Sequence, residues 1–413
     1  MVSWEYPPVV VGGLGRHVHA LATELAVAGH DVVVLCRRPT GSDAATHPTC
    51  DDRAGGVRVL HVAEDPAHLE FERDMVAWIL AMGHALLRAA LTRLGDWRPD
   101  VVHAHDWLVA HPAIALADVL GVPLVATLHA TEAGRHAGWL SAPLNRQVHS
   151  VEWWLANRAD AVITCSRAMC DEVTGLFDLD PVQISVLYNG ITPRGWRVSR
   201  ARVAAARARY TPRGKPLLLY LGRLEYEKGV QDAIAALPRI RRHHPGTRLL
   251  LAGDGTQREL LAERARVHRV ARSVDLLGFL PDGELAALLA AVDAVVLPSR
   301  YEPFGIVALE AAAAGAPLVA STAGGLGEVV LDGDTGLSFA PGDVAGLARA
   351  VGAVLDDPGG AAHRARAARA RLDTDFDWAR IARRTAEVYA STRAGGPAEL
   401  ARPKIPTGNV FGP

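Results

Sequence analysis

Residues 299–318 read SRYEPFGIVALEAAAAGAPL and follow a short apolar run at residues 294–297. The apolar run predicts a buried strand, and the small apolar residues near the end of the stretch predict a helix that packs closely on a sheet. Pro303 restricts Glu302 to an extended or turn conformation, so this carboxylate belongs to the loop between the strand and the helix. Glu310 falls inside the helix. A strand, loop and helix in this order form one unit of an open α/β sheet, in which ligands bind at the carboxyl ends of the strands.

The two carboxylates of this stretch, Glu302 and Glu310, are eight positions apart. If both were helical they would stand about 12 Å apart along the axis, so they can hold different parts of one extended ligand. Acids at this spacing also occur on solvated helices, and the spacing alone leaves that interpretation open. Phe304 and Gly305 follow the strand end, where α/β sheets place their ligands, and this position favours binding.

The same strand and helix unit recurs along the chain of 413 residues. Continuous apolar runs, such as residues 217–221, are typical of parallel strands buried on both faces. We therefore predict an α/β fold of two doubly wound, Rossmann-like domains that face a central cleft. The predicted boundaries are 1–195 for the first domain, 196–214 for a linker, 215–375 for the second domain, 376–392 for a last amphipathic helix and 393–413 for a tail expected to be disordered.

The overall composition is that of an ordinary globular enzyme. The formal net charge of -1 gives no global reason to expect binding to nucleic acid. Basic stretches at residues 194–213 and 363–371 favour solvated helix faces, with a weak contact to an anionic membrane surface or an acidic polymer as the alternative. Four cysteines without metal-ligand spacing fit a reducing cytoplasm. We find no signal peptide and no apolar run near 18 residues, so we expect no membrane-spanning segment. The first predicted strand, residues 1–4, is short, which suggests that a few residues precede Met1.

Two glycine-rich segments, one in each half of the chain, open predicted helices. Glycines at a helix N-terminus present backbone N–H groups to an anion such as a phosphate. The first segment, residues 12–15, lacks the third glycine of the dinucleotide fingerprint, which disfavours a nucleotide-dependent oxidoreductase. The second segment is AGGLGE, with Gly324, Gly325 and Leu326 at its centre.

Two cations, Arg223 and Lys228, follow the predicted strand at residues 217–221. They can clamp a diphosphate, because arginine supplies forked donors and lysine a point charge. The alternative is that they pair on the surface with Glu225 and Glu227. Their position at a strand end favours phosphate binding.

His103, His105, Asp106 and His129 stand at the ends of consecutive predicted strands. A single histidine in such a position is more often structural than functional. Polar neighbours around His129 favour a role for it in the site. We expect His103 and His105 to point to opposite sides of an extended strand and therefore not to share a metal ion, and we predict no metal site.

Arg223 with Lys228, then Glu302 to Glu310, then Gly324-Gly325-Leu326 in this order resemble the retaining GT-B glycosyltransferases of family 4 and the glycogen synthase group. The resemblance covers nearly the whole chain, from SWEYPPVVVGGLG through HAHDW to the last helix. More closely, the chain resembles actinobacterial α-1,4-glucosyltransferases that extend glycogen-like and methylglucose lipopolysaccharide chains. The resemblance implies that the last helix crosses back onto the first domain.

The resemblance also implies the reaction and the roles. Glucose would pass from UDP-glucose or ADP-glucose to the 4-hydroxyl of an α-glucan or methylglucose polysaccharide, with no obligatory metal or other cofactor; the oligomeric state stays open. Arg223 and Lys228 would neutralise the leaving diphosphate. Glu302 would contact the donor sugar and Glu310 the ribose. The expected catalytic residues are His129, Arg223, Lys228 and Glu302, with Asp106 on the acceptor side and further donor contacts at Gly13, Phe304, Gly305, Gly324, Gly325 and Leu326.

Two positions depart from the family pattern. Val10 and Val11 stand where bacterial glycogen synthases that use ADP-glucose carry Lys-Thr, so we favour UDP-glucose as the donor. Thr192 stands where the family motif Asn-Gly-Ile-Asp has its acid. An NDP-sugar epimerase of the same fold and a non-catalytic nucleotide-sugar-binding protein are the alternatives to a transferase.

Overall fold

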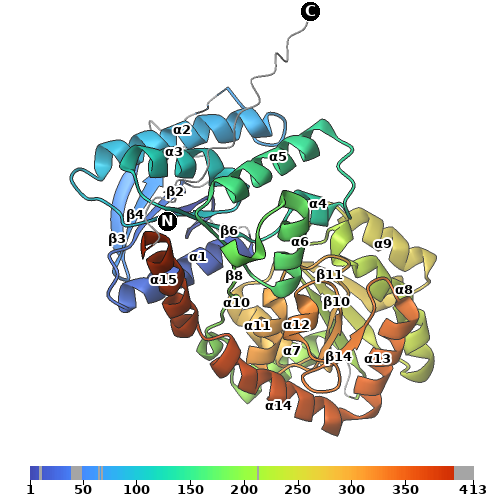
Figure 1. Ribbon diagram of the computed structural model, residues 1–413. Helices are drawn as coiled ribbons and strands as arrows, with labels where there is room; N and C mark the ends of the chain where they lie inside the picture. The colour runs from blue at the N-terminus through green and yellow to red at the C-terminus, as the bar shows by residue number, and fades with distance from the viewer. Residues whose placement is uncertain (9–11, 39–48, 64–65, 67, 212–213, 395–413) are drawn as a thin grey trace, which may run out of the picture.

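The computed structural model describes residues 1–8, 12–38, 49–63, 66, 68–211 and 214–394, which form two α/β domains (Figure 1). Val10 and Val11 lie outside the described residues, as do residues 395–413 of the predicted tail. Each domain is built on a largely parallel sheet with helices on its faces, so the predicted doubly wound architecture is confirmed.

The first domain contains an eight-stranded sheet with the order β3-β4-β2-β1-β5-β6-β7-β8. Its strands are β1 Val2–Ser3, β2 Val33–Arg37, β3 Cys50–Ala54, β4 Val57–Val62, β5 Val102–His105, β6 Leu124–Leu128, β7 Ala161–Thr164 and β8 Ile184–Val186. Its helices are α1 Gly13–Val27, α2 Met75–Arg93, α3 Ala110–Leu120, α4 Glu132–Arg135, α5 Pro143–Arg158 and α6 Arg167–Phe177. The short β1 is central, because Val2 pairs with both Leu35 and Ala104 in parallel register.

The second domain contains a parallel sheet with the order β11-β10-β9-β12-β13-β14. Its strands are β9 Leu217–Leu221, β10 Arg248–Ala252, β11 Val274–Gly278, β12 Ala294–Leu297, β13 Leu318–Ser321 and β14 Leu337–Phe339. Its helices are α7 Arg200–Tyr210, α8 Val230–His243, α9 Arg258–Val267, α10 Asp282–Leu289, α11 Ile306–Ala314, α12 Leu326–Val329, α13 Val344–Asp356 and α14 Pro358–Asp375.

The stretch at residues 299–318 forms the predicted loop and helix after β12. α11 is buried almost all round, with residues 308–313 in the core. Its small side chains explain this burial, since they let the helix lie close to its neighbours. Gly305 precedes the helix with φ +103°, and a Cβ there would lie 2.7 Å from Leu326 Cδ1, so both backbone and space require glycine.

The segment predicted as a linker, residues 196–214, consists mainly of helix α7. α7 contacts α10, and Arg207 donates to Asp293 Oδ2 at 2.9 Å and to the Ala291 carbonyl at 2.7 Å. No residue of α7 is fully buried, which agrees with the expected solvated face of this basic stretch. Most of this segment therefore packs as a surface helix on the second domain.

The last helix, α15 Trp378–Ala394, returns to the first domain and lies beside α1 (Figure 1). Trp378, Ile381 and Ala382 join the core that α1 forms with β2 and β4. Further along the helix, the Tyr389 hydroxyl lies 2.7 Å from His103 Nδ1. The implied crossover of the last helix is confirmed.

Helix α2 corrects the expectation that the chain has no apolar run of membrane-spanning length. Its 19 residues meet that criterion by length and composition, with a mean hydropathy of 1.5. One side of the helix is nevertheless core, since Trp78, Ile79, Met82 and Leu86 are buried with the first sheet. These contacts account for the apolar composition without a membrane.

Candidate functional site at the domain interface

The loop after β12 joins the two domains. Ser166, which caps α6 in the first domain, donates its hydroxyl to the Pro303 carbonyl at 2.6 Å. From α12, Glu328 accepts the amides of Arg167 and Ala168 at 3.1 and 2.9 Å and the Tyr188 hydroxyl at 3.0 Å. The carboxylate of one domain thus caps a helix of the other, and the acids of residues 299–318 lie at this interface.

Glu302 and Lys228 form the central ion pair of the site. Lys228 Nζ lies 2.9 Å from Glu302 Oε2, and both side chains are largely shielded from solvent. Lys228 ends the turn Tyr226–Lys228 after β9, and Glu302 lies in the loop after the adjacent strand β12. The sequence prediction that both residues lie at strand ends is consistent with this arrangement, and the ion pair fixes them against each other.

Arg223 lies apart from this pair. Its guanidinium pairs with Glu227 at 3.2 Å and its side chain is about half exposed, at 51%. Glu225 instead accepts the amide and hydroxyl of Thr256 at 3.0 and 2.5 Å. In this conformation Arg223 therefore adopts the surface pairing that was the alternative interpretation, whereas Lys228 does not.

Glu310 is engaged by the first domain. Arg16 Nη1, near the start of α1, lies 2.7 Å from Glu310 Oε1. The Glu310 side chain is only 6% exposed, whereas Arg16 is 43% exposed. Burial raises the pKa of Glu310 to about 7, although the Arg16 cation opposes this rise. The two carboxylates of the opening stretch thus have separate cationic partners, one from each domain.

The glycine-rich segments lie where the two domains approach closely. A Cβ on Gly13 would lie 2.7 Å from Ile306 Cδ1, so α1 and α11 touch at their first turns. Gly324 has φ +50°, and its Cβ would lie 2.5 Å from the Glu302 carbonyl. That same carbonyl accepts the Gly325 amide at 3.0 Å. In this conformation the Gly325 amide therefore supports the Glu302 loop and is not directed at an anion.

Phe304 and Leu326 are core residues, so a donor contact at these two positions would come from the backbone and stays a prediction. Phe304 is 2% exposed, with its ring centroid 5.7 Å from that of Tyr188 and 6.0 Å from that of Phe376. Leu326 is completely buried and packs over Gly305. Their side chains face the hydrophobic core and have no surface left for a ligand.

His129 and Asp106 are brought together by the first sheet. Asp106 follows β5 with φ +63°, and its Oδ1 accepts the His129 amide at 2.7 Å. Burial raises the pKa of Asp106 to about 6, while the hydrogen bond from His129 opposes the rise. Burial also lowers the pKa of His129 to about 4, so its imidazole is neutral at neutral pH.

His103 and His105 lie on the same side of β5, which corrects the prediction that they diverge. Residues two apart share one face of a strand, and their ring centroids are 4.1 Å apart. His105 Nδ1 is also 3.3 Å from His129 Nε2.

Three histidines of the first domain form a set that could hold a transition metal. His17 from α1, His105 and His129 place ring nitrogens within 4.8 Å of one another. Asn189 Oδ1 lies 2.7 Å from His17 Nδ1, which leaves Nε2 as the free nitrogen. Catalysis without a metal stays a prediction.

A separate cavity of about 400 Å³ lies at the end of the first sheet where the amino ends of its central strands are found. Met1, Leu94, Val102 and Tyr389 contribute to its wall, at the amino ends of β1, β2 and β5. The candidate site lies at the carboxyl ends of these strands, where open α/β sheets bind their ligands. The cavity therefore does not belong to the candidate site.

Comparison with known proteins decides the family. The family model described as Glycosyltransferase Family 4 matches residues 11–194, and the model described as Glycosyl transferases group 1 matches residues 205–371. A glycogen synthase of Mycobacterium tuberculosis (strain ATCC 25618 / H37Rv) is 60% identical over 401 residues, which are 96% of this chain and 95% of that protein. The chain belongs to these glycosyltransferases.

Other relatives of this glycosyltransferase match it over nearly the same length at lower identity. An alpha-maltose-1-phosphate synthase of Mycolicibacterium smegmatis is 31% identical over 95% of this chain and 99% of its own length. The solved structure of sucrose-phosphate synthase from Thermosynechococcus elongatus superposes with a TM-score of 0.79 at 26% identity, covering 95% of this chain and 98% of that one. The GT-B fold and the enzyme class that the motifs indicated are confirmed.

Several residues of the glycosyltransferase site were missed by the sequence reasoning. Tyr301 donates its hydroxyl to Glu172 at 2.9 Å and accepts the Thr131 amide at 3.2 Å. Arg16 and Glu328 also join the domains. Arg16 directly follows the first Gly-Gly-Leu-Gly and Glu328 ends the second glycine-rich segment, so proximity to these segments was the available signal. Tyr301 precedes Glu302, and no pattern around it distinguishes a role.

Proposed function

We propose that this glycosyltransferase moves glucose from a nucleoside diphosphate glucose to the 4-hydroxyl of an α-glucan, with retention of the anomeric configuration. The observation that supports this proposal most is a contact between the two loops that carry candidate catalytic residues, one loop from each domain. The Tyr301 hydroxyl accepts the Thr131 amide at 3.2 Å. This contact brings the loop of Glu302, one residue from Tyr301, to the loop of His129, two residues from Thr131.

The identity of 60% to a mycobacterial glycogen synthase supports a glucan acceptor. The superposition on a sucrose-phosphate synthase supports an enzyme that acts on sugars. A methylglucose polysaccharide is the further acceptor that we propose from the sequence resemblance. We expect a cytoplasmic enzyme, since all four cysteines are free thiols.

In the proposed reaction the acceptor attacks the donor on the face from which the phosphate leaves. The bond between C1 of glucose and the phosphate oxygen breaks while a bond from C1 to the acceptor O4 forms. The proton of the 4-hydroxyl passes to the leaving phosphate. Double displacement would need a carboxylate on the opposite face of the sugar ring, and we assign none.

Lys228 supplies the positive charge for the leaving phosphate in this scheme. Its ammonium is held at 2.9 Å by Glu302, so the charge is in place before the donor binds. Arg223 would add its forked donors after leaving Glu227, which its exposure permits. In the same scheme Glu302 would contact the donor sugar, and Glu310 would contact the ribose.

His129 would line the position of the transferred glucose from the first domain. Its neutral imidazole can donate or accept a hydrogen bond but carries no charge at neutral pH. Asp106 holds the His129 backbone, which sets the direction of the loop. No step requires His129 to carry a proton away.

A donor and acceptor panel tests the proposal. UDP-glucose and ADP-glucose are each incubated with maltoheptaose, with glucose 1-phosphate or without an acceptor, and products are resolved by mass spectrometry. The proposal expects growth of maltoheptaose by glucose units. Transfer only to glucose 1-phosphate would exclude the glucan acceptor, free sugar without acceptor would indicate an epimerase, and binding without reaction a non-catalytic protein.

A further inference from the structure

An exposed tryptophan lies on the loop between α4 and α5. Trp139 is 74% exposed, although its backbone is well held. The Trp139 amide donates to the His136 carbonyl at 2.9 Å, and the Gly138 amide donates to the Ala133 carbonyl at 2.7 Å. A large apolar ring that a fixed loop presents to water is typical of a binding surface, because little ordering remains to be done when a partner arrives.

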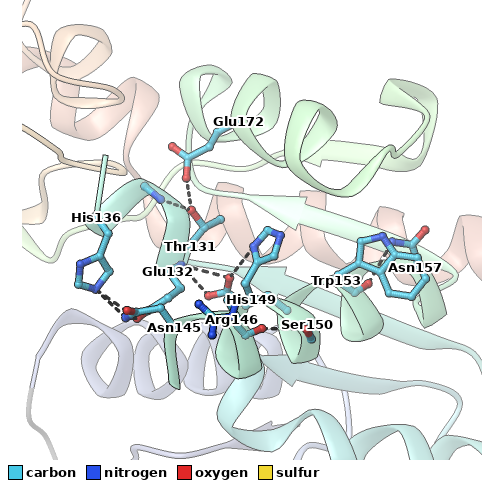
Figure 2. Close-up of polar contacts among 12 residues, drawn as sticks. Thr131, Glu132, His136, Asn145, Arg146, His149, Ser150, Trp153, Asn157 and Glu172 are labelled. Atoms are coloured by element: carbon cyan, nitrogen blue, oxygen red, sulfur yellow. Dashed lines mark hydrogen bonds and ion pairs between the residues drawn. The ribbon is translucent and has the colours of Figure 1, made fainter. Parts of the chain in front are cut away.

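A polar network joins the two helices that flank this loop, α4 and α5 (Figure 2). Asn145 Nδ2, at the start of α5, donates to Glu132 Oε1 at 2.5 Å and lies 3.2 Å from His136 Nε2. The Glu132 amide in turn donates to the buried carboxyl of Glu152 at 2.9 Å. These contacts join α4 to α5 on both sides of Trp139, so the scaffold fixes the backbone that carries the indole.

The loop leads directly out of the candidate site. β6 ends one residue before His129, and α4 begins three residues after it. α4 packs on the second domain, since a Cβ on Gly134 would lie 2.4 Å from the ring of Tyr301, the neighbour of Glu302. Trp139 follows ten positions after His129. An acceptor chain that follows this segment away from the reacting sugar would reach the loop.

The chemistry around Trp139 suits a sugar polymer. The apolar C–H face of a glucose ring packs on an indole, and its hydroxyls bind polar side chains around the rim. Arg135 and His136 are exposed next to Trp139 and can supply such donors. We propose that Trp139 is a platform for a glucose unit of the acceptor beyond the unit that is extended. This inference rests on the proposed transfer to an α-glucan.

Substitution of the indole tests the platform through the dependence on acceptor length. Trp139→Ala should raise KM for maltoheptaose about 5- to 10-fold, since about half of a large apolar side chain loses its cover. KM for the donor and turnover at saturating acceptor should stay unchanged. Trp139→Phe should restore most of the affinity. Trp153→Ala is the matched control, because Trp153 is also exposed, at 45%, but lies about 12 Å further along α5 than Asn145.

A second measurement reads the indole directly and does not depend on how the Ala variant folds. In the wild-type enzyme labelled with 5-fluorotryptophan, the ¹⁹F resonance that is absent from Trp139→Phe belongs to Trp139. We expect maltoheptaose to shift this resonance and glucose to leave it in place. An unshifted resonance, or an Ala variant with wild-type KM for every acceptor, would overturn the platform while glucan transfer stands. If the wild-type enzyme extends no α-glucan, the proposed function and the platform both fail.

Discussion

Replacing Glu310 with glutamine should separate two effects of this buried acid: its effect on the stability of the fold and its contribution to nucleotide binding. The carboxyl is 6% exposed, and burial raises its pKa from 4.5 to about 7. The folded chain therefore favours the protonated form. The stability linked to this group is fully present below about pH 4.5 and is lost as pH rises through about 7, by an amount on the order of 3 kcal/mol. Glu310→Gln lacks this loss, because its amide does not ionise.

The Gln variant should consequently gain stability relative to the wild type as pH rises from 5 to 8, by roughly 5 °C in Tm. Thermal unfolding of both proteins at both pH values gives this double difference, in which the titration of other groups cancels. Glu263→Gln, on the exposed face of α9, controls for the chemical change itself. The partner Arg16 is 43% exposed and remains solvated in the variant, so it adds little to the cost.

The same substitution should weaken binding of the nucleotide. A carboxylate that accepts ribose hydroxyls contributes about 1.5 to 3 kcal/mol, so affinity for UDP or ADP should fall about 10- to 100-fold. Calorimetric titration measures this fall. If Glu310→Gln shows the wild-type pH dependence of Tm and binds both nucleotides as the wild type does, the description of Glu310 as a buried ribose acceptor is refuted.

Three further predictions concern the residues around this acid. Lys228→Ala should lower turnover about 100- to 1,000-fold, as loss of one charge donor at a leaving group does, and near-normal steady-state rates with saturating substrates would contradict its assignment. Glu302→Ala should chiefly lower turnover, whereas Glu310→Ala should chiefly raise the donor Kd; the opposite pattern in paired kinetics and calorimetry would reverse the two roles. Glu328→Ala removes the acceptor at the start of α6 and should lower the free energy of unfolding by about 1 kcal/mol. The same variant should increase the radius of gyration in small-angle scattering, and an unchanged radius would show that other contacts hold the domains together.

The strand and helix pattern of both domains could be predicted because the central strands are buried on both faces. β9 and β12 are continuous apolar runs for this reason, and they lie at the predicted strands, residues 217–221 and 294–297. β3 was missed because its sequence, CDDRA, is polar and mostly exposed at a sheet edge. β8 and β14 have three residues each, which is too short for a periodic signal.

The candidate site could be located from the sequence, but the contacts between its residues could not be predicted. Strand ends and glycines indicated where Lys228 and Glu302 lie. The pair Arg16 and Glu310 joins residues 294 positions apart in different domains, and no local pattern contains the relative placement of two domains. Phe304 shows the other limit, because a ring beside a binding loop looks the same in sequence whether it faces a ligand or, as here, the core.

The linkage formed in the product tests the central claim most directly. The wild-type enzyme is incubated with maltoheptaose and the nucleoside diphosphate glucose that it accepts, labelled with ¹³C at C1 of glucose, and the product is followed by NMR as it forms. The account predicts a new labelled α-1,4 linkage at the non-reducing end of the chain. A β-linked product, or label that appears only as free glucose, would contradict it.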